Sequence, residues 1–160
     1  MRMAALLIAA LAAMPLAAQQ ASPELERARV EKKAWVALNM DLTGAEADVF
    51  WPIYESYQKE LTQINTRLAR ALESYGAYYR NDTLSDEAAR KLTQDALAVE
   101  ESELKLRRTY FVRLSKALPA RKAARYLQLE NKVRTQVHYE LADTLPLVGD
   151  TRLKATPWVK

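Results

Sequence analysis

The sequence predicts an all-α fold of about four helices, arranged as long antiparallel helical hairpins. Three observations support this fold class. Alanine, leucine, glutamate, lysine, arginine and glutamine are abundant and favour helix, whereas the 160 residues include only 3 glycines. Apolar residues recur at helical spacing along several segments, and residues suited to begin a helix precede those segments.

Residues 1–18 are expected to form a secretory signal peptide. Arg2 precedes an apolar run over residues 4–13 that is too short to span a bilayer, and Pro15 breaks that run. Small residues follow at 17–18, where cleavage is plausible. We therefore expect an exported, periplasmic protein, and this location excludes functions that depend on ATP or on access to a genome.

The rest of the chain is expected to form one helical domain over residues 22–142, followed by an irregular tail over residues 143–160. The tail contains Pro146, Gly149 and Pro157, which do not favour a continued helix. The chain has no cysteine, so an exported domain of this size must be stabilised by burial or by self-association.

The first helix is predicted from about Pro23 to Met40. Ser22 is suited to cap it, and Pro23 suits its first turn. Its expected apolar side consists of Leu25, Ala28, Trp35 and Leu38.

The second helix is predicted to begin after Thr43 and to end near residues 80–82. Thr43 and Glu46 have the spacing of a capping box. Pro52 is expected to kink this helix, which would be about 55 Å long. An apolar heptad predicts its buried stripe, which consists of Phe50, Tyr54, Tyr57, Leu61, Ile64, Leu68, Ala71 and Tyr75.

The third helix is predicted to begin after Ser85, with Asp86 and Glu87 in its first turn, and to run to about Ala117. It carries two apolar stripes. One consists of Leu92, Ala96, Val99, Leu106, Tyr110 and Leu114; the other consists of Leu97, Leu104, Phe111 and Leu118. We interpret both stripes as core, because a helix that is apolar on two faces lies between two neighbours. The alternative is that one face contacts a ligand.

The fourth helix is predicted to begin within the segment Leu118–Pro119. Its apolar stripe consists of Tyr126, Leu129, Val133, Val137 and Leu141. In the tail, Leu145, Leu147 and Val148 are the residues expected to dock on the bundle.

Charge is strongly segregated along the chain. The formal net charge is +4, but acids dominate residues 82–103 and bases dominate residues 105–134. One interpretation is a solvated surface in which bases near the end of the third helix are favoured by its dipole. Bases near the start of the fourth helix do not fit that explanation, and the alternative is a surface that binds anionic partners. The candidate binding residues are Arg107, Arg108, Arg113, Lys116, Arg121, Lys122 and Arg125.

The sequence contains no recognisable catalytic motif. It has no cysteine, and His138 is its single histidine. No Glu-x-x-His pair supports a di-iron bundle, and no glycine-rich loop could hold a phosphate. We therefore expect no enzymatic activity, no metal site and no cofactor.

The predicted helix starts resemble the Leu-Thr-x-x-Gln motif of the Spy/CpxP-type periplasmic protein family. Leu42-Thr43-Gly44-Ala45-Glu46 matches this motif in form, with glutamate in place of glutamine, and weaker versions begin at Leu84 and Leu118. The resemblance implies a thin, antiparallel, Spy-like cradle that is a homodimer. Its basic and patchily apolar concave face would hold unfolded envelope proteins without ATP.

The chain is therefore expected to resemble a periplasmic chaperone whose basic residues capture unfolded or partly folded envelope proteins. Two alternatives remain. One is a regulator of envelope stress that binds the periplasmic domain of a membrane sensor, and the other is a protein that adheres to an anionic membrane surface. Nucleic-acid binding would fit the charge but not the expected compartment.

Overall fold

The computed structural model describes residues 23–149, and within this range the chain forms four α-helices. The helices are α3 (Pro23–Met40), α4 (Gly44–Asn81), α5 (Asp86–Ala117) and α6 (Ala120–Thr144). They make up 89% of the described residues, which confirms the all-α class. The expected signal peptide and the end of the expected tail lie outside the described residues. None of the four helices is long and apolar enough to cross a membrane.

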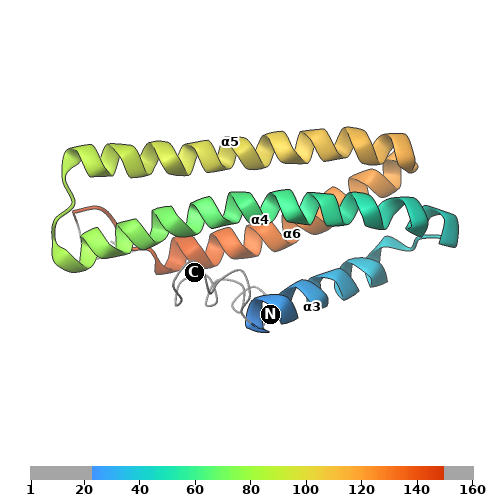
Figure 1. The fold of residues 1–160 in the computed structure, drawn as a ribbon, viewed down its shortest axis with the longest axis horizontal. Helices are drawn as coiled ribbons and strands as arrows, with labels where there is room; N and C mark the ends of the chain where they lie inside the picture. The colour runs from blue at the N-terminus through green and yellow to red at the C-terminus, as the bar shows by residue number, and fades with distance from the viewer. Residues whose placement is uncertain (1–22, 150–160) are drawn as a thin grey trace, which may run out of the picture.

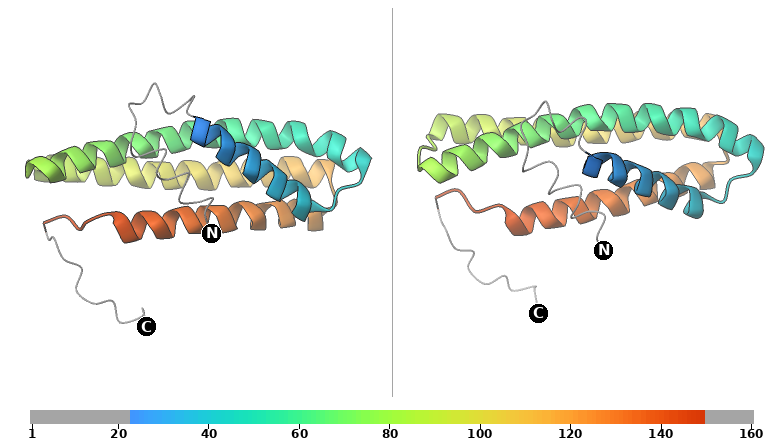
Figure 2. Two further views of the ribbon diagram at one scale, coloured as in Figure 1. Left: turned by 90° about the horizontal axis from the view of Figure 1, so that it is seen from below. Right: turned by 60° about the horizontal axis from the view of Figure 1, so that its bottom comes forward.

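The three long helices lie along one another, and the chain reverses direction at each connection between them (Figure 1). α4 packs most extensively against α5, α5 contacts α6, and α3 contacts α6. α3 crosses the space between α4 and α6 at an angle and reaches along only part of their length (Figure 2). One half of the bundle, next to the α3–α4 and α5–α6 connections, is therefore covered by α3, and we call it the covered half. The other half, which contains the α4–α5 connection, is called the far half.

The ends of α4 follow the expected capping chemistry. The backbone N–H of Glu46 donates to the Thr43 hydroxyl oxygen at 3.3 Å, and the Thr43 backbone N–H donates to the Glu46 carboxylate at 2.8 Å, which confirms the capping box. α4 continues through Pro52 as one helix. It ends at Asn81. The next residue, Asp82, caps the helix: its φ of 53° is left-handed, and its N–H donates to the carbonyls of Tyr78 and Tyr79. These local interactions explain why the bounds of α4 could be predicted closely.

The core lies mainly in the covered half. The predicted heptad of α4 is confirmed, since all of its members are buried or half-buried. The predicted stripe of α6 is confirmed in the same sense. The fully buried side chains include Phe50, Tyr110, Leu114 and Tyr126, which belong to one continuous cluster. In the tail, Leu145 is half-buried, whereas Leu147 and Val148 are exposed, so the expected docking holds only for Leu145.

The apolar side predicted for α3 was wrong in part. Leu38 is 85% exposed, whereas Val36 and Met40, which were not predicted, are fully buried. The buried row of α3 is Ala28, Lys32, Val36 and Met40, spaced by four residues. Because one position of this row is a lysine, the row does not stand out in the sequence as an apolar stripe.

The prediction for the second stripe of α5 was also wrong. The first stripe is confirmed as core, but Leu97 is 60% exposed, Leu104 is 41% exposed and Phe111 is 38% exposed. Leu118 is the exception, because it lies in the α5–α6 connection and is buried there. α4 and α6 both pack on the side of the first stripe, so within the described chain no neighbour covers the second.

Candidate binding surface

A buried polar network joins α3, α4 and α6 beneath α3. Lys32 Nζ lies 2.8 Å from a Glu130 carboxylate oxygen and donates to Gln58 Oε1 at 3.0 Å. The Gln58 amide nitrogen donates to Glu130 at 2.9 Å and lies 3.1 Å from the Tyr126 hydroxyl oxygen. Lys32 and Glu130 are both buried, and each is satisfied by the other and by Gln58. This network fixes α3 on the bundle and offers no free group for chemistry.

Aromatic side chains fill the space between α4 and α6, whose backbones approach each other less closely than those of α4 and α5. The ring centroid of Tyr126 lies 5.2 Å from that of Phe50 and 5.7 Å from that of Tyr57, both edge-on. Burial, assisted by the charge of Glu130, raises the pKa of Tyr57 and Tyr126. These tyrosines are therefore neutral core residues rather than part of a binding surface.

Two of the seven candidate binding residues hold α3 in place. Lys122 Nζ contacts the Glu46 carboxylate and donates to the Asp41 backbone carbonyl at 2.7 Å. Arg125 Nε donates to the Asn39 backbone carbonyl. α3 has no basic residue in its last turn, so these two cations of α6 interact with its C-terminal carbonyls. These contacts with the end of α3 explain why two cations lie near the start of α6, where the dipole of α6 itself disfavours them.

Of two further candidates, Arg107 is partly buried and Arg113 is exposed against an aromatic ring. Arg107 is half-buried, and its Nε has no hydrogen-bond partner within residues 23–149. Its positive charge partly opposes the rise in the pKa of Tyr57, which indicates that the guanidinium group lies near the core. Arg113 is exposed, and its guanidinium carbon lies 4.8 Å from the centroid of the Tyr110 ring.

The remaining candidates, Arg108, Lys116 and Arg121, are exposed. None of them makes a side-chain hydrogen bond or ion pair with another residue of the described range. Lys116 and Arg121 lie on either side of the α5–α6 connection, together with Arg113. We call Arg113, Lys116 and Arg121 the basic end. Arg108 lies earlier on α5 than Arg113 and Lys116, between the exposed residues Leu104 and Phe111 of the second stripe.

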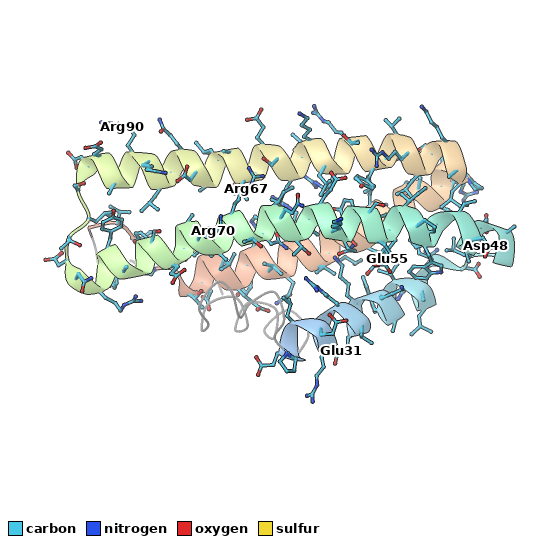
Figure 3. All side chains as sticks on the ribbon, in the orientation of Figure 1. Glu31, Asp48, Glu55, Arg67, Arg70 and Arg90 are labelled. Atoms are coloured by element: carbon cyan, nitrogen blue, oxygen red, sulfur yellow. The ribbon has the colours of Figure 1, made fainter. Side chains whose placement is uncertain are left out.

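Apolar side chains are exposed at the same end of the bundle. Val112 of α5 is 52% exposed next to Arg113, and Leu38 lies beside Asn39, to which Arg125 is bound. Val112 was not among the predicted binding residues, because its exposure depends on where α4 and α6 pack. Figure 3 shows that charged side chains also project from the rest of the surface, including Asp48 near the start of α4 and Arg67 and Arg70 further along it.

The described residues hold no group of three or more His, Cys, Asp or Glu side chains that could bind a metal ion. His138 Nε2 lies 3.8 Å from Glu103, which is already bound by Arg134 at 2.7 Å. Two shallow depressions, one lined by residues of α6 that include Leu127 and Lys132 and one lined by residues of α3 that include Arg27 and Val30, are open to solvent. The exposed bases of the basic end and the exposed side chain of Val112 offer cation–anion attraction combined with apolar contact.

Comparison with known proteins adds no assignment. No protein-family model, curated protein sequence or solved structure matches the chain significantly.

Proposed function

We propose that the chain is an exported, ATP-independent binding protein that captures unfolded or partly folded envelope proteins at its basic end. One observation carries this proposal: Arg113, Lys116 and Arg121 are exposed at the end of the bundle where the apolar side chain of Val112 is also exposed. Lys116 and Arg121 are not paired with an acid of the described chain, and they remain available to a partner.

This combination suits a partner that is acidic in places and exposes apolar side chains. Long-range attraction by unpaired cations accelerates encounter, and apolar contact then prolongs it. An unfolded protein offers both kinds of group. A surface that is open rather than a closed pocket accepts many sequences weakly, which is the requirement for a general chaperone.

The structure changes which substitutions test the proposal. Lys122 and Arg125 hold α3, so their replacement would alter the fold as well as the surface. We therefore choose Lys116→Glu together with Arg121→Glu, both at exposed positions. The purified wild-type protein should slow the aggregation of a chemically unfolded acidic protein at low salt, measured by light scattering. The double variant should protect less, and added salt should weaken wild-type protection because it screens the attraction.

The matched control is Lys59→Glu with Lys132→Glu, which changes the net charge equally at exposed positions away from the basic end. It should protect as well as the wild type. Equal protection by both double variants would contradict the role of the basic end. Failure of the wild type to protect any unfolded protein, with recovery of one stoichiometric partner from envelope extract, would favour the sensor-binding alternative.

A further inference from the structure

α3 is attached to the bundle through one short row of side chains. Its 18 residues bury Ala28, Lys32, Val36 and Met40, so one of these buried positions is a charged residue. None of the apolar members of the row is aromatic, and Trp35 adds a ring that is only half-buried. The apolar contribution of α3 to the core therefore comes from a few side chains on either side of a buried charge.

The other attachments of α3 are polar. Lys33 pairs with Glu55 where both side chains are about half exposed. Lys122 and Arg125 of α6 bind backbone carbonyls at the C-terminal end of α3. Exposed ion pairs contribute little to stability, and a buried pair loses much of its attraction to the cost of desolvation. These contacts fix where α3 lies, but water can replace them when α3 leaves.

The surface beneath α3 is suited to hold a helix. Phe50 of α4 and Tyr126 of α6 place their ring centroids 5.2 Å apart. α3 crosses the space between α4 and α6 that these rings fill (Figure 2). Gln58 and Glu130 lie in the same surface and bind the ammonium group of the buried lysine. We call this surface, marked by Phe50, Gln58, Tyr126 and Glu130, the docking face. It combines aromatic rings with one buried carboxylate.

The connection between α3 and α4 allows α3 to move without disturbing α4. Residues 41–43 separate the two helices. Asp41 has a φ of 48°, a left-handed conformation that is unfavourable for most residues other than glycine. Thr43 is fixed to the start of α4 by its capping box with Glu46. A rotation at Asp41 therefore redirects α3 and leaves the start of α4 intact.

We propose that α3 is a detachable cover and that the docking face, once uncovered, binds an amphipathic helix of a partner protein. The chemistry of the face defines that helix. It carries apolar side chains at steps of four residues, as α3 does, and one lysine or arginine among them that pairs with Glu130. α3 is tethered to the same face and competes with the partner, which binds only those chains that α3 has left. This binding uses none of the residues of the basic end, so it is independent of client capture there.

Lys32→Glu should release α3. It places a second carboxylate against Glu130 where both side chains are buried, and the two acids repel each other. α3 should leave, while α4, α5 and α6 stay helical by circular dichroism. In hydrogen exchange, the amides of residues 23–40 should exchange at least about tenfold faster than in the wild type. Lys33→Glu is the matched control and should change this exchange less, because Lys33 and Glu55 are about half exposed.

A fluorescent peptide with the sequence of residues 23–40 is the probe for the docking face. By anisotropy it should bind the Lys32→Glu chain at least about tenfold more tightly than the wild type, whose own α3 covers the face. A peptide that carries Lys32→Glu should not bind this chain. It should bind a Glu130→Lys chain, in which the two charges are again opposite. Lys116→Glu with Arg121→Glu, added to the Lys32→Glu chain, should leave binding of the unchanged peptide as it was.

The wild-type protein provides a test that does not depend on the folding of a variant. Its α3 amides should exchange at least about tenfold faster than the buried amides of α5, because α3 opens alone. Equal rates would overturn the proposal, since α3 would then open only when the whole chain unfolds. A folded Lys32→Glu chain that does not bind the peptide would also overturn it. So would wild-type dimers that dissociate when the peptide is added, because α3 of a second copy would then be the occupant of the docking face.

Discussion

The covered half and the far half of the bundle contain the same three long helices but bury their side chains to different degrees. In the covered half, Phe50, Leu114 and Tyr126 are completely buried. In the far half, the corresponding positions Leu92 and Val137 are only half-buried. Three helices alone leave part of every helix in contact with water, and α3 supplies the fourth helix over only one half.

The two halves also differ in how they use polar groups. The covered half contains the buried network around Lys32 and Glu130, and cations of α6 bind the end of α3. In the far half, the Tyr75 hydroxyl donates to the carbonyl of Pro146 at 2.7 Å, which attaches the residues after α6 to α4. Specific polar pairs, as well as apolar burial, therefore fix α3 on the bundle. Changes at those pairs should therefore destabilise the covered half most.

The largest effect is expected at the buried ion pair. Lys32→Met should lower the free energy of unfolding by about 3–5 kcal/mol, because it leaves Glu130 charged, buried and without its cation. Lys33→Met is the matched change, since Lys33 pairs with Glu55 where both side chains are about half exposed. It should cost at most about 1 kcal/mol. Urea unfolding followed by circular dichroism measures both.

A second substitution separates loss of the pair from loss of packing. In Lys32→Met/Glu130→Met the unpaired charge is gone, so much of the stability should return. Equal losses for the Lys32 and Lys33 variants would contradict the distinction between a buried and an exposed pair, and with it the account of how α3 is held.

A smaller effect is expected from packing, and it should differ between the halves. Leu114→Ala removes a completely buried side chain and should cost about 2–5 kcal/mol through lost burial and the cavity left behind. Leu92→Ala makes the same change on the same helix at a half-buried position in the far half. It should cost about 1 kcal/mol, since less apolar surface returns to water. Similar urea midpoints for both variants would show that the halves are equally packed.

The helices and most of the core could be predicted from the sequence, because capping and apolar periodicity are local features. Thr43 and Ser85 begin α4 and α5 as their capping chemistry predicts, and the α4 heptad lies on the buried side. The apolar side of α3 could not be predicted, because Lys32 occupies a buried position and its partner Glu130 lies on a helix distant in sequence. Periodicity finds an apolar face, but only the tertiary arrangement decides whether a neighbour covers it. That is why the α5 stripe through Leu104 was assigned to the core.

Only part of the candidate surface could be predicted, again because the tertiary arrangement decides which residues meet. A cluster of seven bases is visible in the sequence, but their partners are backbone carbonyls and acids that folding brings close. The positions of Lys122 and Arg125 did indicate a partner outside their own helix, since bases at the start of a helix are disfavoured by its dipole. The carbonyls of Asn39 and Asp41 at the end of α3 resolve that conflict. Such a conflict between a charge and its own helix points to a partner on another helix.

The smallest effect on stability is expected from a change of pH. It concerns Glu46, which lies where the end of α3, the start of α4 and the start of α6 meet. The hydrogen bond from Lys122, and then that from the Thr43 backbone, lower the pKa of Glu46 below its ordinary 4.5. Because the pKa is lower in the folded state, the Glu46 carboxylate stabilises the fold above pH 4.5 and loses that contribution as the pH falls through the lowered value. Glu46→Gln should therefore be less stable than the wild type at neutral pH, and the difference should close under acid.

Urea midpoints measured from pH 7 downward would follow this closing difference, with Glu87→Gln at the start of α5 as the far-half control. Glu87 also lies in the first turn of its helix, but it is exposed and no lysine of another helix binds it within residues 23–149. Its substitution should change stability less than Glu46→Gln at neutral pH. A Glu46 difference that persists unchanged below pH 4.5 would mean that the carboxylate is not what Lys122 recognises. The end of α3 would then depend on the carbonyl contacts of Lys122 and Arg125, and not on the negative charge of Glu46.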